Sequence, residues 1–341
     1  MMRPTRLQIA AAVAVLAGTT LVAANVTVRL ATIVPRNSLW YGALTDMGAT
    51  WQKDTASRVT LVTFPDGKLA PDEPGSIKLM RPDMDQVNAA MLTTPGLATI
   101  DEAFNVFGMP FFLASEDEAR AVRDAITPAL SAKLEAKGYH FINWGHGGWV
   151  QLFSRSEIRS IDALKKSKLY TSWGDDHMVR WYTKNGFNPV PTKALDMATN
   201  LGTGLLEAAP SPAYAAAMIQ LYRSANYMLD LRLGPLYGAV IITDRVWKNI
   251  SETDRAKVLE AGQAMQKQLD GSVPAQDDKA IADMKARNPK FTVTKLTDKE
   301  LAAFRAEGER LAPTLRTDGI VPGDIYDLAM AARDAFRKKA K

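Results

Sequence analysis

The chain has 341 residues, with 42 Lys and Arg against 37 Asp and Glu, and it has no cysteine. The formal net charge of +5 is too weak to favour nucleic acid as a partner. Without thiols the chain has no disulfide, no cysteine nucleophile and no cysteine metal ligand. Stability must therefore come from an apolar core, which a chain of this length can build.

The N-terminal stretch "MMRPTRLQIAAAVAVLAGTTLVAAN" has two arginines followed by an apolar run that ends in small residues. This is the layout of a secretory signal peptide. An uncleaved anchor helix is the alternative, but Gly18-Thr19-Thr20 interrupts a run that would need about 20 mostly apolar residues. We predict export to the periplasm, with residues 1–24 as the signal peptide.

We expect cleavage near Ala24, because small residues at positions such as Val22 and Ala24 suit signal peptidase sites. N-terminal sequencing of the exported protein should therefore begin near Asn25. Recovery of the protein from the cytoplasm with Met1 intact would contradict this prediction.

The rest of the first half alternates strand-like and helix-like segments, which predicts an α/β fold. Strands are predicted at 26–34, 58–64, 86–93, 139–144 and 149–154, with "GHGG" (145–148) as a break between the last two. Asn37 or Ser38 can cap the first helix. Apolar residues at helical spacing are Trp40, Leu44, Met47 and Trp51, and then Ala119, Val122, Ile126, Leu130 and Leu134.

The second half continues the alternation. Strands are predicted at 168–172, 205–209, 227–233 and 236–243, and "PSP" (210–212) closes the second of them. Asp175 and Asp176 open a helix that ends before Gly186. Capping boxes are predicted at Ser251 with Asp254 and at Thr297 with Glu300.

About 300 residues of alternating α/β structure usually form two lobes. We place the chain crossings at "GHGG" and around 234–236, and we expect a ligand cleft between the lobes beyond the strand ends. The predicted limits are lobe I at 25–148, lobe II at 149–233, a return to lobe I with a long spanning helix at 234–296, and C-terminal helices packing across the lobes at 297–341.

The stretch "LYTSWGDDHMVRWY" (169–182) raises the question of chemistry. Ser172 and His177 could serve an exported hydrolase, but members of a triad are normally far apart in sequence, and the chain has no Gly-x-Ser-x-Gly elbow. Asp175, Asp176 and His177 could bind a metal, but adjacent residues on a helix point in different directions. The two carboxylates suit a helix N-terminus. We predict no catalytic residue, no metal and no cofactor.

Aromatic residues provide the other signal. Trp144, Trp149, Tyr170 and Trp173 lie beside glycine breaks or at strand-to-helix turns. In α/β sheets such positions face the ligand crevice. Burial in the core is the alternative for each of them.

The order of segments resembles the solute-binding proteins of TRAP transporters, of the DctP type. The resemblance covers nearly the whole mature chain. It rests on "RLATIVP", "FPDGKL" (64–69), "NVFGMPFF" (105–112), "SIDALKKSKLYTS" (160–172), "NGFNPVP" (185–191) and "LGTGLLEAAPSP" (201–212). It implies a two-lobe, periplasmic-binding-protein-like α/β fold that closes on a small molecule, and TRAP-type membrane subunits as partners.

The chain departs from this family at its carboxylate-reading positions. The family's clamping arginine corresponds to Tyr170, and a second basic contact corresponds to Trp149-Val150. The Gln and Asn of the family pattern fall on Ala209 and Ser211. Burying an unpaired carboxylate in a closed cleft costs on the order of several kcal/mol. We therefore expect an aromatic, apolar or lipid-like ligand.

The predicted function is capture of this ligand and delivery to the membrane transporter, with no enzymatic step. An exported hydrolase using Ser172 and His177, or an interaction protein that kept the fold without a ligand, are the alternatives. The predicted ligand-binding residues are Tyr170, Trp149, Trp173, Ser211 and Tyr214 on the second lobe, with Asn37, Trp40, Thr93, Thr94 and Tyr237 on the first.

Overall fold

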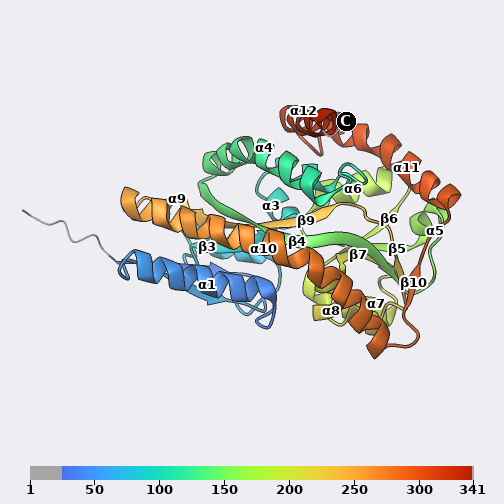
Figure 1. Cartoon of the computed structure of the whole chain (residues 1–341), viewed down its shortest axis with the longest axis horizontal. Coiled ribbons are helices and arrows are strands. Elements are labelled where there is room, and N and C mark those ends of the chain that lie inside the picture. The colour runs from blue at the N-terminus through green and yellow to red at the C-terminus, as the bar shows by residue number, and fades with distance from the viewer. Residues whose placement is uncertain (1–24, 340–341) are drawn as a thin grey trace, which may run out of the picture.

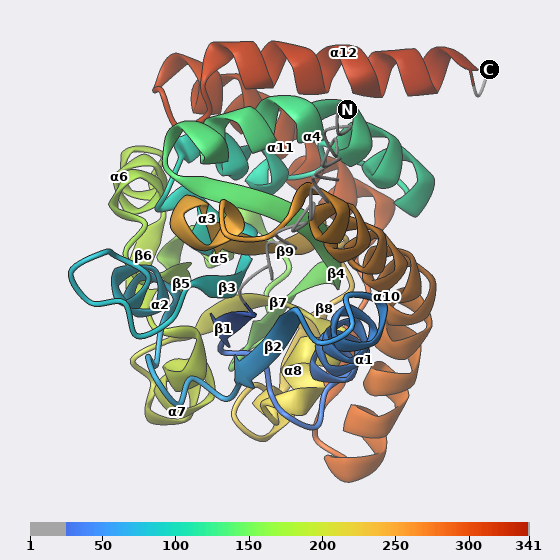
Figure 2. The same ribbon diagram turned by 90° about the vertical axis from the view of Figure 1, so that its left-hand side faces the viewer.

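The computed structural model describes residues 25–339, so the predicted signal peptide lies outside the described residues. One sheet runs through the molecule with the strand order β2-β1-β3-β9-β4-β7-β5-β6, and β8 joins β4 to β10. Helices cover it on both sides (Figures 1 and 2). No helix in this part of the chain is both long and apolar enough to span a membrane.

The strands are β1 (Val26–Ala31), β2 (Val59–Phe64), β3 (Ala89–Thr93), β4 (Tyr139–Ser154), β5 (Lys168–Ser172), β6 (Asn188–Thr192), β7 (Ala208–Pro212), β8 (Tyr227–Leu229), β9 (Pro235–Thr243) and β10 (Thr292–Thr294). The α-helices are α1 (Leu39–Asp54), α2 (Glu73–Leu79), α3 (Thr94–Ala98), α4 (Glu116–Ala136), α5 (Ile161–Lys166), α6 (Asp176–Lys184), α7 (Met197–Thr203), α8 (Ala213–Met218), α9 (Asp244–Trp247), α10 (Glu252–Arg287), α11 (Asp298–Thr317) and α12 (Gly323–Lys339). Short 3₁₀ helices are η1 (Glu102–Gly108), η2 (Ala194–Asp196) and η3 (Leu221–Arg223).

The sheet has two halves that share β4. Along 139–149 this strand pairs antiparallel with β9, and along 150–154 it pairs with β7. The first half adds β3, β1 and β2, and the second half adds β5 and β6. The change of partner lies at the crossing expected from the sequence, and the lobe limits given there stay predictions.

The "GHGG" segment does not break the strand, contrary to the prediction of two strands. Instead β4 continues through it with register shifts between Phe141 and Asn143 and between His146 and Gly148. Glycine allows this because a Cβ on Gly147 would lie 2.9 Å from the Leu236 carbonyl oxygen. Gly148 has a φ of +107°, which disfavours other residues. The glycines therefore bend β4 at the crossing without ending it.

The strand predicted at 205–209 is also displaced, because β7 begins at Ala208 and includes the "PSP" segment that was expected to close it. Prolines cannot donate a ladder hydrogen bond. The prolines of β7 are tolerated because β7 pairs with β5 only between Ala208 and Leu169. The β5-facing edge of β7 after Ala208 therefore needs no further ladder hydrogen bonds. The strand predicted at 227–233 is shorter than expected and ends at Leu229.

Helix starts follow the local sequence closely. Ser38, rather than Asn37, caps α1 and accepts a hydrogen bond from the Tyr41 backbone N–H. The capping box of Thr297 and Glu300 is confirmed at the start of α11. Ser251 caps α10 as predicted, but the Asp254 carboxylate pairs with Arg58, with 2.7 Å between Oδ1 and Nη2.

The spanning helix α10 runs along both halves of the sheet (Figure 1). It packs closely on β4 at Gly262, where a Cβ would lie 2.9 Å from Ile142 Cγ2. Farther along, the Asp277 carboxylate accepts the backbone N–H groups of Trp149 (3.0 Å) and Tyr214 (2.8 Å). One side chain of α10 thus fixes the backbone at the crossing and at the start of α8.

Candidate functional site

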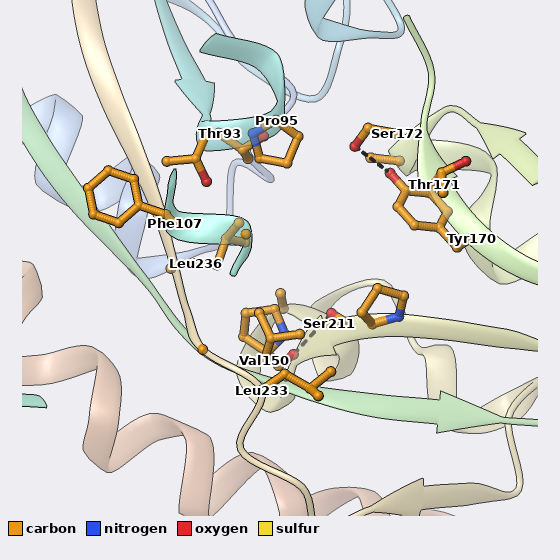
Figure 3. A pocket seen from close by; sticks show the side chains of 18 of the residues that line it. Thr93, Pro95, Phe107, Val150, Tyr170, Thr171, Ser172, Ser211, Leu233 and Leu236 are labelled. Atoms are coloured by element: carbon orange, nitrogen blue, oxygen red, sulfur yellow. Dashed lines mark hydrogen bonds between the residues drawn. The ribbon is translucent and has the colours of Figure 1, made fainter. Parts of the chain in front are cut away.

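A cavity of about 430 Å³ lies between the two halves of the sheet. Figure 3 shows Thr93 and Pro95 of the first half facing Tyr170 and Ser172 of the second across an open space, with Ser211 on a further side. Its size is in the range of pockets that enclose small organic molecules. The cavity is therefore the candidate ligand site.

Six of the ten predicted ligand-binding residues line this cavity. They are Trp40, Thr93, Thr94, Tyr170, Ser211 and Tyr237. The structure thus brings together residues that are up to about 200 positions apart, as a crevice at the strand ends predicts.

The other four residues lie outside the lining. Trp149 is buried on the opposite side of β4, where the Arg232 guanidinium lies 4.4 Å from its ring centroid. Trp173 is 48% exposed. The Tyr214 ring packs on Trp40 with 5.0 Å between centroids, and its hydroxyl accepts the Leu39 N–H. Asn37 is exposed before α1.

Strand alternation explains why Val150 lines the cavity while Trp149 does not. Successive side chains of a strand point to opposite faces. The sequence indicated the right position in the chain for this wall, but the face depends on how β4 is twisted and bulged at the crossing.

Tyr170 stands on β5, and its hydroxyl lies 3.4 Å from the Ser172 Oγ. Burial of this hydroxyl raises the pKa of Tyr170 to about 12. The side chain is therefore neutral at physiological pH. Its ring can stack on a ligand and its hydroxyl can donate or accept a hydrogen bond, but it cannot form an ion pair with a carboxylate.

The charged residues of the lining are all acidic. They are Glu73, Asp175 and Glu307, and no Lys, Arg or His lines the described cavity. The charge of Glu307 is balanced from outside the lining by Arg310 and by Lys165, whose Nζ lies 2.8 Å from Glu307 Oε1. Hydrogen bonds from Arg310 and then Lys165 lower the pKa of Glu307 to about 2. Burial raises the pKa of Glu73, whose oxygens accept the N–H and hydroxyl of Thr93.

Two buried hydroxyls in the lining have no hydrogen-bond partner among the described residues. They are Thr171 Oγ1 and Tyr237 Oη. A buried polar group without a partner is costly, and such groups in native structures call for an explanation. Both can serve a ligand with uncharged polar groups.

The floor of the cavity is supported by a buried polar network. His146 is fully buried, with Nε2 2.8 Å from Glu116 Oε2, and its Nδ1 accepts the Gly148 N–H. Arg123 is also buried, with Nη1 2.8 Å from Asp270 Oδ1 and its guanidinium 5.2 Å from the Tyr237 ring centroid. These contacts fix the position of the Tyr237 ring.

Ser172 and His177 are not brought together as a catalytic pair. His177 Nε2 lies 3.1 Å from Glu102 Oε1 on an exposed surface, while Ser172 lines the cavity beside Tyr170. Asp175 caps α6 by accepting the Met178 N–H. Within residues 25–339, no three His, Asp or Glu side chains are grouped closely enough to hold a metal ion.

Comparison with known proteins agrees with this architecture. Residues 30–316 match the model of the bacterial extracellular solute-binding proteins of family 7, DctP. The chain belongs to this family. The two-lobe α/β fold predicted from the sequence is therefore confirmed. A search of curated protein sequences found no significant match.

Solved structures of TRAP periplasmic solute-binding proteins have the same fold. A sugar acid binding protein from Advenella mimigardefordensis, in complex with galactonate, is 18% identical with a TM-score of 0.82 over 92% of this chain and 99% of that one. One from Sulfurospirillum deleyianum with bound succinate is 17% identical, with a TM-score of 0.81 over 91% and 99%. One from Xanthobacter autotrophicus with bound β-D-galacturonate is 19% identical, with a TM-score of 0.79 over 90% and 99%.

Much of the lining of this DctP-family chain was not predicted residue by residue. It includes Glu73, Phe107, Thr171, Leu233 and Leu236. The "NVFGMPFF" segment and the crossing at 234–236 indicated two of these neighbourhoods. Nothing in the sequence around Glu73 indicates a cavity, because α2 reaches the site only through tertiary packing.

We expect Ser172→Ala and His177→Ala variants to show no loss of a hydrolytic activity, because neither side chain contacts the other. A screen with ester, amide and phosphate substrates on the wild type and both variants checks this. Turnover that disappears in each single variant would show that the two residues do work together.

Proposed function

We propose that this protein is the extracytoplasmic receptor of a TRAP-type transporter, and that it captures an uncharged, largely apolar organic ligand and delivers it to the membrane subunits. Family membership supports the receptor role. One observation carries the ligand class: the cavity lining has no cationic side chain in the described chain, and its other members are mostly apolar or aromatic.

Charge balance gives the reason. A carboxylate ligand would lose its hydration in the closed cleft and would find no Lys, Arg or His in the lining to pair with it. Burying a charge without a partner is strongly unfavourable. An uncharged ligand avoids this cost, and burial of its apolar surface contributes about 25 cal/mol per Å².

Lobe closure supplies the mechanism of capture. Ligand bound between the halves contacts both of them, so it stabilises the closed state by its differential affinity. Two polar contacts join the halves: Lys193 Nζ lies 2.9 Å from Asp72 Oδ2, and His177 Nε2 lies 3.1 Å from Glu102 Oε1. The open cavity also argues against the alternative of an interaction protein with a collapsed crevice.

Native mass spectrometry of the exported protein, followed by titration calorimetry, tests the proposal. Succinate and its uncharged dimethyl ester form one matched pair, and phenylnaphthylamine and its sulfonated analogue anilinonaphthalenesulfonate form another. We expect the uncharged member of each pair to bind more tightly.

We also expect the affinity for the uncharged ligand to change little between low and high salt, because no cation of the lining steers or holds it. Tight and strongly salt-sensitive binding of succinate would contradict the proposal. It would mean that a basic residue outside the lining, such as Arg180 or Arg232, reaches the ligand.

A further inference from the structure

The cavity extends beyond the cleft between the two halves. Its lining continues to α5, α6, the turn that follows α6, and α11. The residues are Ile161, Leu164, Met178, Trp181, Tyr182, Phe187, Phe304 and Leu311. We call the part of the cavity lined by these eight residues the α11 chamber. None of them was expected to contact ligand from the sequence.

Polar contacts tie the walls of the α11 chamber together. Trp181 Nε1 donates to Thr314 Oγ1 at 2.9 Å, which links α6 to α11. Lys165 pairs with Glu307 at 2.8 Å, which links α5 to α11. Because these groups bond to one another, the chamber offers a ligand an apolar surface with few free hydrogen-bonding groups.

Phe111 lies where α11 meets the cavity wall. Its φ of +58° is rare for a bulky residue, and its backbone N–H donates to the Leu233 carbonyl at 2.8 Å. On α11, a Cβ at Gly308 would lie 2.5 Å from the Phe111 ring. Rarely populated backbone conformations cluster at active sites and ligand-binding sites.

We propose that the α11 chamber holds the apolar chain of an elongated, uncharged amphiphile whose polar end lies in the cleft beside Tyr170. This inference rests on the proposed function. The unpartnered hydroxyls of Thr171 and Tyr237 provide hydrogen bonds for the polar end. No cationic side chain of the lining can pair with a fatty-acid carboxylate there, so an uncharged alcohol, ester or amide head is the class that fits.

A series of straight-chain alcohols of increasing length tests this proposal, with displacement of phenylnaphthylamine as the readout. We expect the affinity to rise about fourfold per methylene, which corresponds to about 0.8 kcal/mol per buried CH₂. The rise should stop when the chamber is full.

Two variants fill the chamber and one serves as control. Leu311→Trp and Leu164→Trp should each end the rise at a shorter chain, because the larger side chain occupies part of the chamber. Leu301→Trp makes the same substitution on α11 at a position outside the lining, and it should behave as the wild type. Circular dichroism checks that each variant is folded, and if one is not, the other filling variant and the wild-type series decide.

The outcomes separate this proposal from the receptor function. Short uncharged ligands that bind without any dependence on chain length would overturn the chamber proposal and leave the proposed function intact. A rise that continues unchanged in both filling variants would also overturn it. If succinate binds and no uncharged compound does, the proposed ligand class fails together with the chamber.

Discussion

Arg123→Leu is expected to lower the free energy of unfolding by about 3–5 kcal/mol, the cost of breaking a buried ion pair by removing one partner. Only 2% of the Arg123 side chain is exposed, and it pairs with Asp270, which is 12% exposed. Burial lowers the pKa of Arg123, but its hydrogen bonds to Asp270 and Asp124 hold that pKa above its usual range. Leucine would leave the Asp270 charge without this partner. Denaturant unfolding monitored by circular dichroism measures the change.

Two further variants test the cause. The double variant Arg123→Leu with Asp270→Leu should recover part of the loss, because it removes both charges. Arg120→Leu on the same helix removes an exposed pair with Asp117 and should cost about 0–1 kcal/mol. A loss in Arg120→Leu equal to that of Arg123→Leu would mean that burial of the pair is not the cause.

Tyr170→Ala is expected to weaken ligand binding by about 1–3 kcal/mol, as removal of an aromatic contact in a buried site does. The residue lies on β5 in the wall of the cavity, and burial of its hydroxyl keeps it neutral. Calorimetry with phenylnaphthylamine, or with a ligand identified by mass spectrometry, measures the change.

Tyr170→Phe separates the ring from the hydroxyl. If stacking dominates, phenylalanine should retain most of the affinity, because it keeps the aromatic face and loses one hydrogen bond. Wild-type affinity in Tyr170→Ala would show that the ligand does not lie against β5. That result would also move the polar end of the proposed amphiphile away from this strand.

The predictions that agree best with the structure depend on short-range chemistry. The strand at 168–172 has the predicted limits, Asp175 and Asn185 flank α6, and Thr297 with Glu300 forms the expected capping box. Hydrogen bonds within one turn and alternation along one strand decide such features. They are encoded by neighbouring residues and can be read without knowledge of the fold.

The ligand site was only partly predictable, because it depends on contacts between residues far apart in the sequence. The sequence located its walls, because glycine breaks and strand-to-helix turns mark crevice positions, but it pointed to Trp149, whereas Val150 lines the cavity. That choice depends on the bulge at Gly148 and on the pairing of β4 with two partners. Trp173 likewise follows β5 directly but lies at the surface.

The sequence by itself determined the α/β class and the family order of segments, because these are properties of residue identity and local pattern. Only the tertiary structure decided that Glu73 and Tyr170 line the same cavity, and that this lining has no cationic side chain. It also decided that α11 contributes to the cavity wall. These facts arise from contacts between residues about 100 or more positions apart. Such contacts are set by the packing of whole elements, which no short stretch of sequence records.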